Sequence, residues 1–375
     1  MMKSKVMFKL IFLIGALLCC NMGYSQDKSP TLLPVRGFCI GAPRAAKLDP
    51  FIAFINDELA PMHVNTLILR VDYNYQYKSH PELSDTLSLS KDDVKKIVDV
   101  CRKNSIKVIP QINLLGHQSW AGKVGKLLKV YPQFDETPWI EMPQNYTWPN
   151  SDSLYCKSYC PLHPGVHKVV FELVDELCDA FETDAFHAGM DEVFYIGSDK
   201  CPRCHGKDKA ALYAGEVTTI RNHLATLNRT LWIWGDRLID GKTTGMGEWE
   251  ASVNGTSRAV DLIPKDVMIC DWHYDRAEQS PVYFAMKGLK VVTCTWKKPE
   301  VAKAQFEDML KFKQRSSWDM GQRFQGMILT VWSDAASFID GFKAKTPDEN
   351  GGGNTAWNCF TMLFDQMNGQ ASLKP

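Results

Sequence analysis

Short apolar segments alternate with amphipathic ones along most of the chain. Eight apolar segments are rich in valine, isoleucine, leucine and aromatic residues and are short enough to be buried strands. They cover residues 35–40, 66–71, 107–112, 185–188, 230–234, 267–271, 290–293 and 325–331. Most of the intervening segments have helical spacing of their apolar residues. In residues 92–102, for example, Val94, Ile97, Val98 and Cys101 fall on one face of a helix.

Eight successive strand-then-helix units predict an α/β fold, and we expect a (β/α)8 TIM barrel. A doubly wound open sheet is the alternative, but no Gly-x-Gly-x-x-Gly loop follows any predicted strand. The sequence shows no linker, repeat or low-complexity tract, so we predict a single catalytic domain over residues 26–375. Residues 131–164 are rich in proline, tryptophan and tyrosine, and we expect them to form an ordered loop over the active end.

The segment after the fourth predicted strand carries the strongest chemical signal. It contains His187, Gly189, Asp191 and Glu192, and the glycine ends the strand pattern. In a barrel, catalytic groups gather at the carboxyl ends of the strands. Neighbouring like charges raise one pKa, which suits one carboxyl group to act as an acid while its partner stays ionised. A solvated turn would explain a bare Asp-Glu pair, but the flanking histidine and glycine favour catalysis.

This motif resembles the His-x-Gly-Gly-Asp-Glu signature of family 20 glycoside hydrolases, the β-N-acetylhexosaminidases, with Met190 in place of the second glycine. The resemblance implies an exo-acting, retaining enzyme in which the 2-acetamido group of the sugar is the nucleophile. Glu192 would protonate the leaving oxygen and later activate water. Asp191 would orient the acetamido group and stabilise the oxazolinium intermediate. We expect the buried His187 to hold the carboxylate pair in place.

Other predicted strand ends match the family residue by residue. Arg44 lies eight residues after Arg36, as the sugar-binding arginine of the family does, and a guanidinium fork suits paired hydroxyl groups. Asp72, after the second strand, is expected either to face the substrate or to support Arg70. His117, after the third strand, matches the active-site histidine of the family.

Tryptophan recurs at the ends of the last four predicted strands. In the family, aromatic residues at matching places enclose the acetamido methyl group and form the floor of the sugar site. The resemblance therefore implies substrate contacts by Trp234, Trp272, Tyr274, Trp296, Trp332 and Asp334. We assign Trp232 to packing beneath the helices. Lys297 stands where the family has a tyrosine for the acetamido carbonyl, a role for which Tyr274 is a candidate, and Asp334 replaces a glutamate.

The resemblance covers residues 36–334 and is greatest to the smaller, single-domain D-type hexosaminidases, because the first strand begins too early for the α+β domain that often precedes this barrel. It implies a glycan or glycoconjugate substrate, no cofactor and no metal. Two other interpretations stay open. One is a barrel glycosidase for a non-acetamido sugar, with Asp236, Asp271 or Asp334 as a second carboxylate. The other is a catalytically inactive carbohydrate-binding protein.

Four cysteines flank the candidate active site in sequence. Cys156 and Cys160 precede the helix that leads into the fourth strand, and Cys201 and Cys204 form a Cys-x-x-Cys motif after the carboxylate pair. We expect both pairs at the same end of the fold. Disulfides or free thiols that shape the loops are the favoured interpretation, and a four-thiolate zinc site is the alternative.

The N-terminal residues 1–25 are predicted to be a secretory signal, with lysines before the apolar run 10–20 and small residues near 23–25. A loose lipobox at Cys19 or Cys20 leaves a lipid anchor open. We therefore expect export to the periplasm or the outer-membrane surface of a bacterium. The 43 basic and 43 acidic residues among 375 give a formal net charge of zero, so no charge excess indicates nucleic-acid binding or disorder.

Overall fold

Eight parallel strands close into a barrel. The computed structural model describes residues 33–142 and 156–372, and the signal and lipid-anchor predictions lie outside these residues. The strand order is β1-β10-β9-β8-β7-β6-β3-β2. Their bounds are β1 Val35–Gly41, β2 Thr66–Arg70, β3 Lys107–Leu114, β6 Ala185–Gly189, β7 Thr230–Trp234, β8 Met268–Trp272, β9 Lys290–Thr295 and β10 Phe324–Thr330. The TIM-barrel prediction is confirmed, with every strand within two residues of its predicted bounds.

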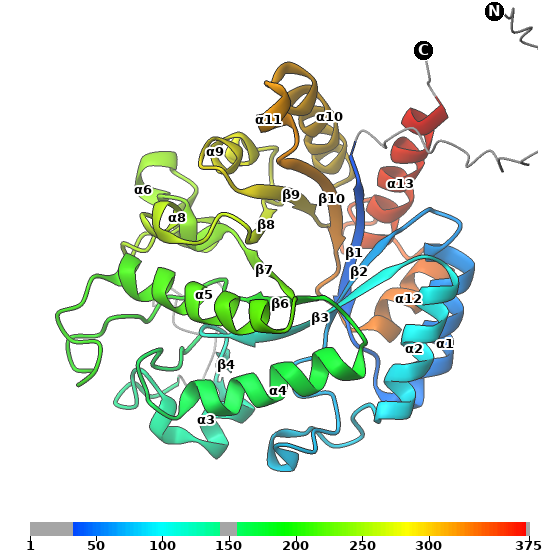
Figure 1. Ribbon diagram of the computed structural model, residues 1–375. Coiled ribbons are helices and arrows are strands. Elements are labelled where there is room, and N and C mark those ends of the chain that lie inside the picture. Colours follow the sequence, from blue (N-terminus) through cyan, green and yellow to red (C-terminus); the bar gives the residue numbers. More distant parts are fainter. Residues whose placement is uncertain (1–32, 143–155, 373–375) are drawn as a thin grey trace, which may run out of the picture. The chain divides into compact units, whose positions relative to one another are not determined.

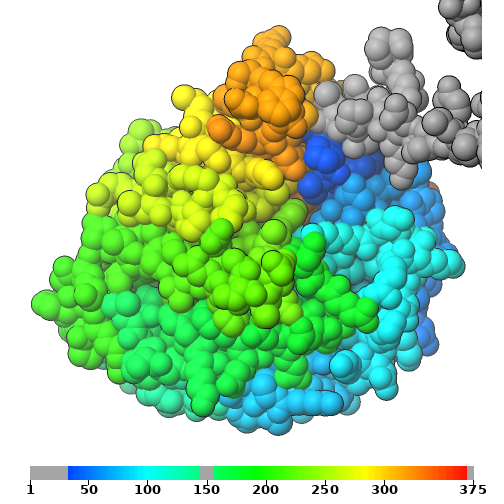
Figure 2. Space-filling view, in the orientation of Figure 1, coloured from blue at the N-terminus to red at the C-terminus, as the bar shows by residue number. Residues whose placement is uncertain are grey.

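Helices surround the barrel, and Figure 1 shows α4 and α5 in front of the strands and α1 and α2 to their right. The longer helices are α1 Leu48–Phe54, α2 Lys91–Lys103, α4 Val166–Ala180, α5 Lys209–Thr226, α9 Ser280–Met286, α10 Pro299–Arg315, α12 Ala335–Ala344 and α13 Ala356–Ser372. Short helices α3 Lys126–Val130, α6 Gly241–Thr244, α7 Gly247–Glu250, α8 Ala259–Leu262 and α11 Trp318–Gly321, and the hairpin of β4 Ser119–Trp120 and β5 Lys123–Val124, lie in the connections. Side chains fill the spaces between the ribbons, as Figure 2 shows for α2 and α4. Among the described residues, no helix is both long and apolar enough to span a bilayer.

Local sequence explains where α2 begins. Ser90 accepts a 3.1 Å hydrogen bond from Asp93 N, and Asp93 Oδ2 accepts one of 3.0 Å from Ser90 N. This capping box satisfies backbone donors that the first helical turn leaves unpaired. Val94, Ile97, Val98 and Cys101 are buried, as their helical spacing predicts.

The interior of the barrel holds an apolar cluster that includes two tryptophans of β7. Its members are Cys39, Ile68, Ile109, Ala185, Trp232, Trp234, Cys270, Trp272, Val292, Cys294 and Ile328. The assignment of Trp232 to the packing under the helices is therefore wrong. Residues two apart in a strand point to the same side, so Trp232 and Trp234 both face inward.

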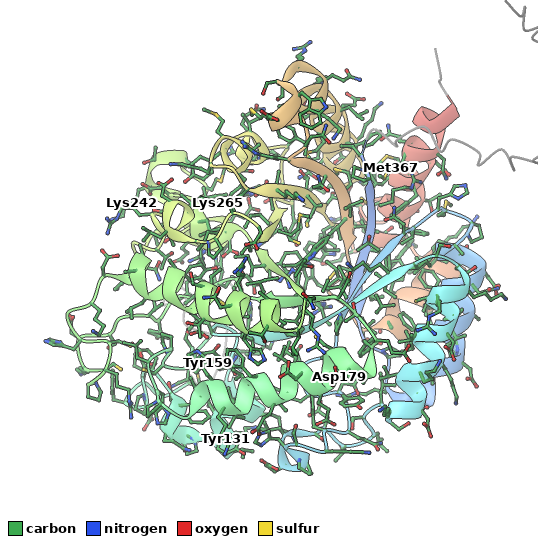
Figure 3. All side chains as sticks on the ribbon, viewed as in Figure 1. Tyr131, Tyr159, Asp179, Lys242, Lys265 and Met367 are labelled. Carbon is green, nitrogen blue, oxygen red and sulfur yellow. The ribbon has the colours of Figure 1, made fainter. Side chains whose placement is uncertain are left out.

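The described parts of the long loop after β3 are ordered against the barrel. Cys160 N donates a 2.7 Å hydrogen bond to Phe134 O, and Tyr159 N donates one of 3.0 Å to Leu115 O. Tyr159, labelled in Figure 3, is fully buried, and its hydroxyl donates a 2.6 Å hydrogen bond to Glu216 of α5. The loop is thus fixed to the segments after β3 and to α5.

A buried histidine connects the end of β8 to the helices around it. His273 Nε2 lies 3.1 Å from Asp271 Oδ1, and its Nδ1 lies 2.9 Å from Glu250 Oε2. Ser280 Oγ donates a 2.6 Å hydrogen bond to the other oxygen of Asp271, and Gln305 Nε2 donates one of 2.7 Å to His273 O. Burial opposes protonation, but the two carboxylates outweigh it and raise the pKa of His273 to about 10.

We predict that His273 stabilises the fold less as the pH rises. Because its folded pKa exceeds the unfolded value of about 6.5, its contribution is complete below that pH and is lost as the pH approaches about 10. Denaturant unfolding of wild type and His273→Gln near pH 6, 8 and 10 checks this. The difference in unfolding free energy should shrink by on the order of 2–4 kcal/mol across the series. A constant difference would contradict the assignment.

Candidate active site

Asp191 and Glu192 follow β6 in a strained turn. Gly189, Met190 and Glu192 have φ of 69°, 73° and 48°, in the left-handed region. A side chain at Gly189 would place its Cβ 2.4 Å from Asn113 Oδ1, so a glycine is required there. Met190 adopts this conformation without being a glycine, which costs about 1 kcal/mol or more. Tyr213 Oη donates a 2.9 Å hydrogen bond to Met190 O and helps to hold the turn.

His117 connects the two carboxylates to the loop after β3. Its Nε2 lies 3.1 Å from Asp191 Oδ2 and 3.2 Å from Glu192 Oε2, and Cys156 Sγ lies 3.0 Å from its Nδ1. Burial opposes protonation of His117, but Cys156 and Asp191 outweigh it and raise its pKa well above the usual range. Burial likewise opposes ionisation of Asp191, yet the charge and hydrogen bond of His117 keep the pKa of Asp191 lowered. Asp191 is therefore an ionised carboxylate at neutral pH.

Asp236, which follows β7, fixes the backbone of the carboxylate pair by hydrogen bonding. Its Oδ2 accepts hydrogen bonds of 2.9 Å from Glu192 N and 2.6 Å from Arg237 Nε, and its Oδ1 accepts one of 3.3 Å from Trp272 Nε1. Burial and the charges of Asp191 and Glu192 outweigh Arg237 and raise the pKa of Asp236 to about 6. Asp236 thus fixes the backbone of Glu192 and the plane of Trp272.

His187 does not hold the carboxylate pair, contrary to our expectation. Its Nδ1 accepts a 3.1 Å hydrogen bond from Gly189 N, and its buried Nε2 has no partner among the described residues. Its ring lies 4.5 Å from that of Trp234, and burial lowers its pKa to about 3. His187 is a neutral packing residue beneath the site, and His117 makes the contact that we assigned to it.

The predicted aromatic residues come together beside the pair. Trp332 Nε1 donates a 2.9 Å hydrogen bond to Tyr274 Oη, and the ring of Trp332 lies 5.7 Å from that of Trp234. Tyr274 also lies 5.2 Å from Trp272 and 5.5 Å from Trp296, ring centroid to ring centroid. The tryptophans of four successive strands therefore form one continuous wall around the Tyr274 hydroxyl.

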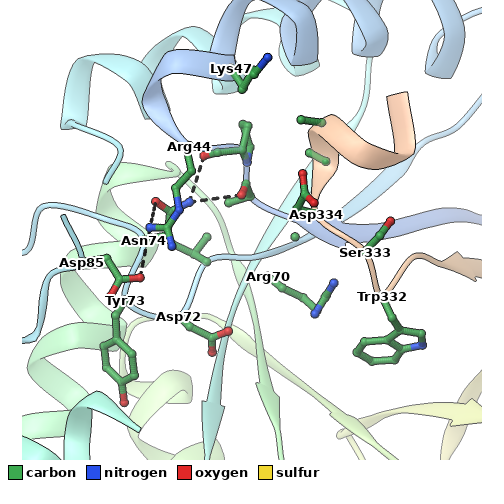
Figure 4. A pocket seen from close by; sticks show the side chains of 16 residues that line it. Arg44, Lys47, Arg70, Asp72, Tyr73, Asn74, Asp85, Trp332, Ser333 and Asp334 are labelled. Carbon is green, nitrogen blue, oxygen red and sulfur yellow. Dashed lines mark hydrogen bonds and ion pairs between the residues drawn. The ribbon is translucent and has the colours of Figure 1, made fainter. Parts of the chain in front are cut away.

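A pocket of about 480 Å³ lies next to this wall and is lined by Arg44, Asp72, Trp332 and Asp334 (Figure 4). Three elements contribute these side chains, β1, β2 and β10, at their carboxyl ends. Asp191 and Glu192 do not line the pocket. The end of β3 lies between the pair and the pocket, since Asn113 lies against Gly189 of β6 and its N donates a 2.8 Å hydrogen bond to Asp72 Oδ1.

The charged residues of the pocket are held by neighbours. Arg44 donates hydrogen bonds of 3.2 Å to Asn74 Oδ1 and to Asp85 Oδ2, and more than half of its side chain is exposed. Asp334 caps α12, where its Oδ1 accepts a 3.0 Å hydrogen bond from Ser337 N. Among the described residues Asp72 forms no hydrogen bond or ion pair with Arg70, but the charge of Arg70 opposes the rise that burial causes in the pKa of Asp72.

Arg70 instead contacts Trp332, which follows β10. Its guanidinium carbon lies 4.7 Å from the centroid of Trp332, and its Nη2 donates a 2.7 Å hydrogen bond to Val331 O. A Cβ on Gly41 would lie 3.6 Å from the same nitrogen. Arg70 therefore supports the wall on the pocket side.

The three alternative carboxylates occupy other roles. Asp271 is buried and bonded to His273 and Ser280, on the opposite side of β8 from the interior residues Cys270 and Trp272. Asp236 is bonded as described, and Asp334 caps a helix. None of the three contacts His117, the histidine that lies beside both Asp191 and Glu192.

Two residues near the pair were missed by the sequence reasoning as site residues. Trp120 lies with its ring 6.0 Å from that of His117 and is 63% exposed. Cys156 contacts His117, although it had been grouped only with the other loop cysteines. The sequence contains one signal for Trp120, which lies three residues after His117, a candidate active-site residue.

Two groups of side chains in the described part of the chain have the donors and spacing to hold a metal ion. One comprises His117, Cys156 and Glu192, and the other comprises Glu136, Cys160, Cys201 and Cys204. In the first, both ring nitrogens of His117 face other site residues, so its donors already serve the carboxylate pair and Cys156.

Residues 45–338 match the sequence profile "Glycosyl hydrolase family 20, catalytic domain". The match covers more than half of the chain. It includes every predicted strand-end site residue except Arg44, which lies one residue before it. The family resemblance carried by the motif around Asp191 and Glu192 is thereby confirmed.

Two individual relatives of the chain are named beta-hexosaminidases. A beta-hexosaminidase of Akkermansia muciniphila is 32% identical over 124 residues, 33% of this chain and 23% of the relative. A beta-hexosaminidase of Emericella nidulans is 25% identical over 273 residues, 66% of this chain and 40% of the relative. The chain thus spans less than half the length of these two relatives. The X-ray structure of Flavobacterium johnsoniae chitobiase shares the fold, with a TM-score of 0.58 and 17% identity over 91% of this chain and 53% of that one.

We predict that Arg237→Gln lowers the free energy of unfolding by about 3 kcal/mol, because it leaves the buried Asp236 carboxylate beside Asp191 and Glu192 without its counter-charge. Denaturant unfolding near neutral pH measures this. Arg221→Gln is the matched control, since it removes a guanidinium from the partly exposed pair with Asp266 and should cost less than about 1 kcal/mol. Equal costs for the two variants would contradict a structural role for the buried pair.

Proposed function

The chain belongs to glycosyl hydrolase family 20, and we propose on that premise that it is an exo-acting β-N-acetylhexosaminidase. It removes terminal β-linked N-acetylglucosamine or N-acetylgalactosamine from glycans with retention of configuration. The acetamido group of the substrate is the nucleophile. A barrel glycosidase for a non-acetamido sugar is the less favoured alternative, because Asp236, Asp271 and Asp334 have the other roles described above.

The observation that carries the proposal is the state of Asp191. It is buried and ionised, its Oδ2 is bound by His117, and its Oδ1 has no partner among the described residues. A buried charged oxygen without a hydrogen bond is costly. The N–H of a substrate acetamido group satisfies it and is oriented by it, so that the acetamido oxygen faces the anomeric carbon.

The reaction follows from the roles of the two acids. The acetamido oxygen forms a bond to the anomeric carbon while the bond to the leaving oxygen breaks, and Glu192 gives its proton to that oxygen. Positive charge develops on the oxazolinium ring next to the Asp191 carboxylate. Glu192, now ionised, takes a proton from water as the water oxygen attacks the anomeric carbon and opens the ring.

We infer that Tyr274 holds the acetamido carbonyl. Its oxygen accepts a hydrogen bond from Trp332 and lies 3.2 Å from Thr330 Oγ1, which fixes it within the aromatic wall. Burial raises the pKa of Tyr274 well above its usual value, so the hydroxyl keeps its proton. It can therefore donate to the carbonyl oxygen, the role of the family tyrosine that Lys297 replaces. The Lys297 ammonium lies over the ring of Trp296, 4.5 Å from its centroid.

We predict that the enzyme hydrolyses para-nitrophenyl N-acetyl-β-glucosaminide and not the matching β-glucoside. Glu192→Gln should lower kcat on the first substrate by about 10²–10⁴-fold, because general acid catalysis is lost. Its affinity for an oxazoline-mimicking thiazoline inhibitor should persist. Asp191→Asn should slow acetamido substrates and weaken the thiazoline. Initial rates and inhibitor titration on the three proteins measure this.

Each other outcome has a definite meaning. Hydrolysis of the plain glucoside by wild type would place the nucleophile on a protein carboxylate. Normal turnover by Glu192→Gln would remove its assignment as the acid. If neither substrate is hydrolysed and the thiazoline inhibitor does not bind, the interpretation as an inactive carbohydrate-binding protein is favoured.

We predict that Tyr274→Phe lowers kcat by about 10²-fold, as the loss of one positioned hydrogen-bond donor to a reacting carbonyl does. The ring contacts with Trp272 and Trp296 remain, so the fold should be retained. Kinetics on the acetamido substrate measure the effect, and Tyr283→Phe, on the outer helix α9, is the control. Equal kinetics for wild type and Tyr274→Phe would assign Tyr274 to packing alone.

A further inference from the structure

Three cysteines and one glutamate form a buried cluster outside the catalytic pair. Glu136 and Cys160 come from the loop after β3, and Cys201 and Cys204 come from the loop after β6. No residue of the four is more than 2% exposed. One donor atom from each lies within 4.8 Å of all the others. Cys156 is not a member, so the four-thiolate set considered from the sequence is not formed.

The sulfur positions fit a tetrahedral ion better than a disulfide. Cys160 Sγ lies 3.7 Å from Cys201 Sγ and 3.5 Å from Cys204 Sγ. Two thiolates each about 2.3 Å from one zinc ion at the tetrahedral angle lie about 3.8 Å apart. A disulfide requires about 2.05 Å. A single disulfide would also leave the third thiol beside the carboxylate.

Glu136 supplies the independent indication of a cation. Its Oε1 accepts a 3.0 Å hydrogen bond from Ser198 N, while its fully buried Oε2 has no nitrogen or oxygen donor among the described residues. The side chains that interact with the carboxylate are the thiols of Cys201 and Cys204. A buried carboxylate surrounded by thiols and lacking a cation is strongly disfavoured. A bound dication would satisfy that oxygen and would displace the three thiol protons to solvent.

Backbone amides are directed at the sulfurs, as at protein zinc sites. Hydrogen bonds from the backbone of Arg203 and Cys204 reach the side chain of Cys201, and one from the backbone of Leu162 reaches that of Cys160. Such outer contacts orient metal ligands. His205, the other potential ligand nearby, is exposed and has its Nδ1 2.8 Å from Asp199 O, so it is not part of the set.

We propose that Cys160, Cys201, Cys204 and Glu136 bind a structural zinc ion. The site is closed, with four protein ligands and no open position, which is typical of zinc that stabilises a fold. It joins the loop after β3 to the loop after β6. Cys160 lies four residues after Cys156, which contacts His117, so the ion also secures the segment that reaches the candidate active site.

Metal analysis of the tag-free protein from zinc-supplemented cells tests this directly. The expected result is about one zinc per chain, with the three thiols reacting with Ellman's reagent only after a strong chelator is added. Cobalt in place of zinc should give thiolate-to-metal absorption bands. A metal-free wild type, or a disulfide among these three cysteines by mass mapping, would overturn the proposal.

Variants separate the ligands from their neighbours. Cys201→Ser and Cys204→Ser should lose the zinc and melt at a lower temperature, and Glu136→Gln should weaken zinc binding at least about tenfold in competition with a chromogenic chelator. Cys156→Ser, from the same loop, should keep the zinc. Loss of zinc in Cys156→Ser, or full retention in Glu136→Gln, would overturn the ligand set. These readouts do not depend on hydrolytic activity, and the metal content of wild type remains informative if a cysteine variant fails to fold.

Discussion

The contact of His117 with two carboxylates and one sulfur is the interaction on which the candidate site depends. A buried cationic imidazole is stable only beside negative charge, and a buried carboxylate pair is stable only beside a cation. His117 and Asp191 therefore keep each other charged. The contact also crosses from the segment after β3 to the turn after β6. It fixes the distance between two loops that the barrel strands alone would leave free to move.

The carboxyl groups of Asp191 and Glu192 have different surroundings. Asp191 touches a cation and is surrounded by protein, so it is held ionised. Glu192 shares the same histidine, whose Nε2 lies 3.2 Å from its Oε2, and its N–H donates a 2.9 Å hydrogen bond to Asp236. Asp236 therefore fixes the backbone of Glu192, while His117 lies between the two carboxyl groups. Burial, together with the charges of Asp191 and Glu192, raises the pKa of Asp236 beneath this turn to about 6. The reaction proposed above would use Asp191 to stabilise charge and Glu192 to transfer protons.

Sequence periodicity predicted the barrel well because each strand is buried on both faces and reads as a continuous apolar run. The carboxylate pair and the tryptophans at strand ends could also be placed, since the fold brings all strand ends to one side. What could not be predicted is which polar groups pair there. His187 lies two residues before Gly189 and His117 directly follows Gly116, so both histidines lie near a glycine at a strand end. Only the path of the chain after β3 brings His117, and not His187, into contact with the carboxylates. The same holds for Cys156, which is close to Cys160 in sequence but serves a different cluster.

The strained turn explains why the family motif can change at one position. The glycine before Asp191 in the family signature is replaced by Met190, which keeps the left-handed φ of 73° at a conformational cost. Two contacts of Met190 offset this conformational cost. Its carbonyl is held by Tyr213 from α5, and its side chain is fully buried in the apolar core. Burial of a methionine side chain contributes about 1.5–3 kcal/mol, which is comparable to or larger than the strain. The turn that presents Asp191 and Glu192 is therefore maintained by packing where the family maintains it by glycine.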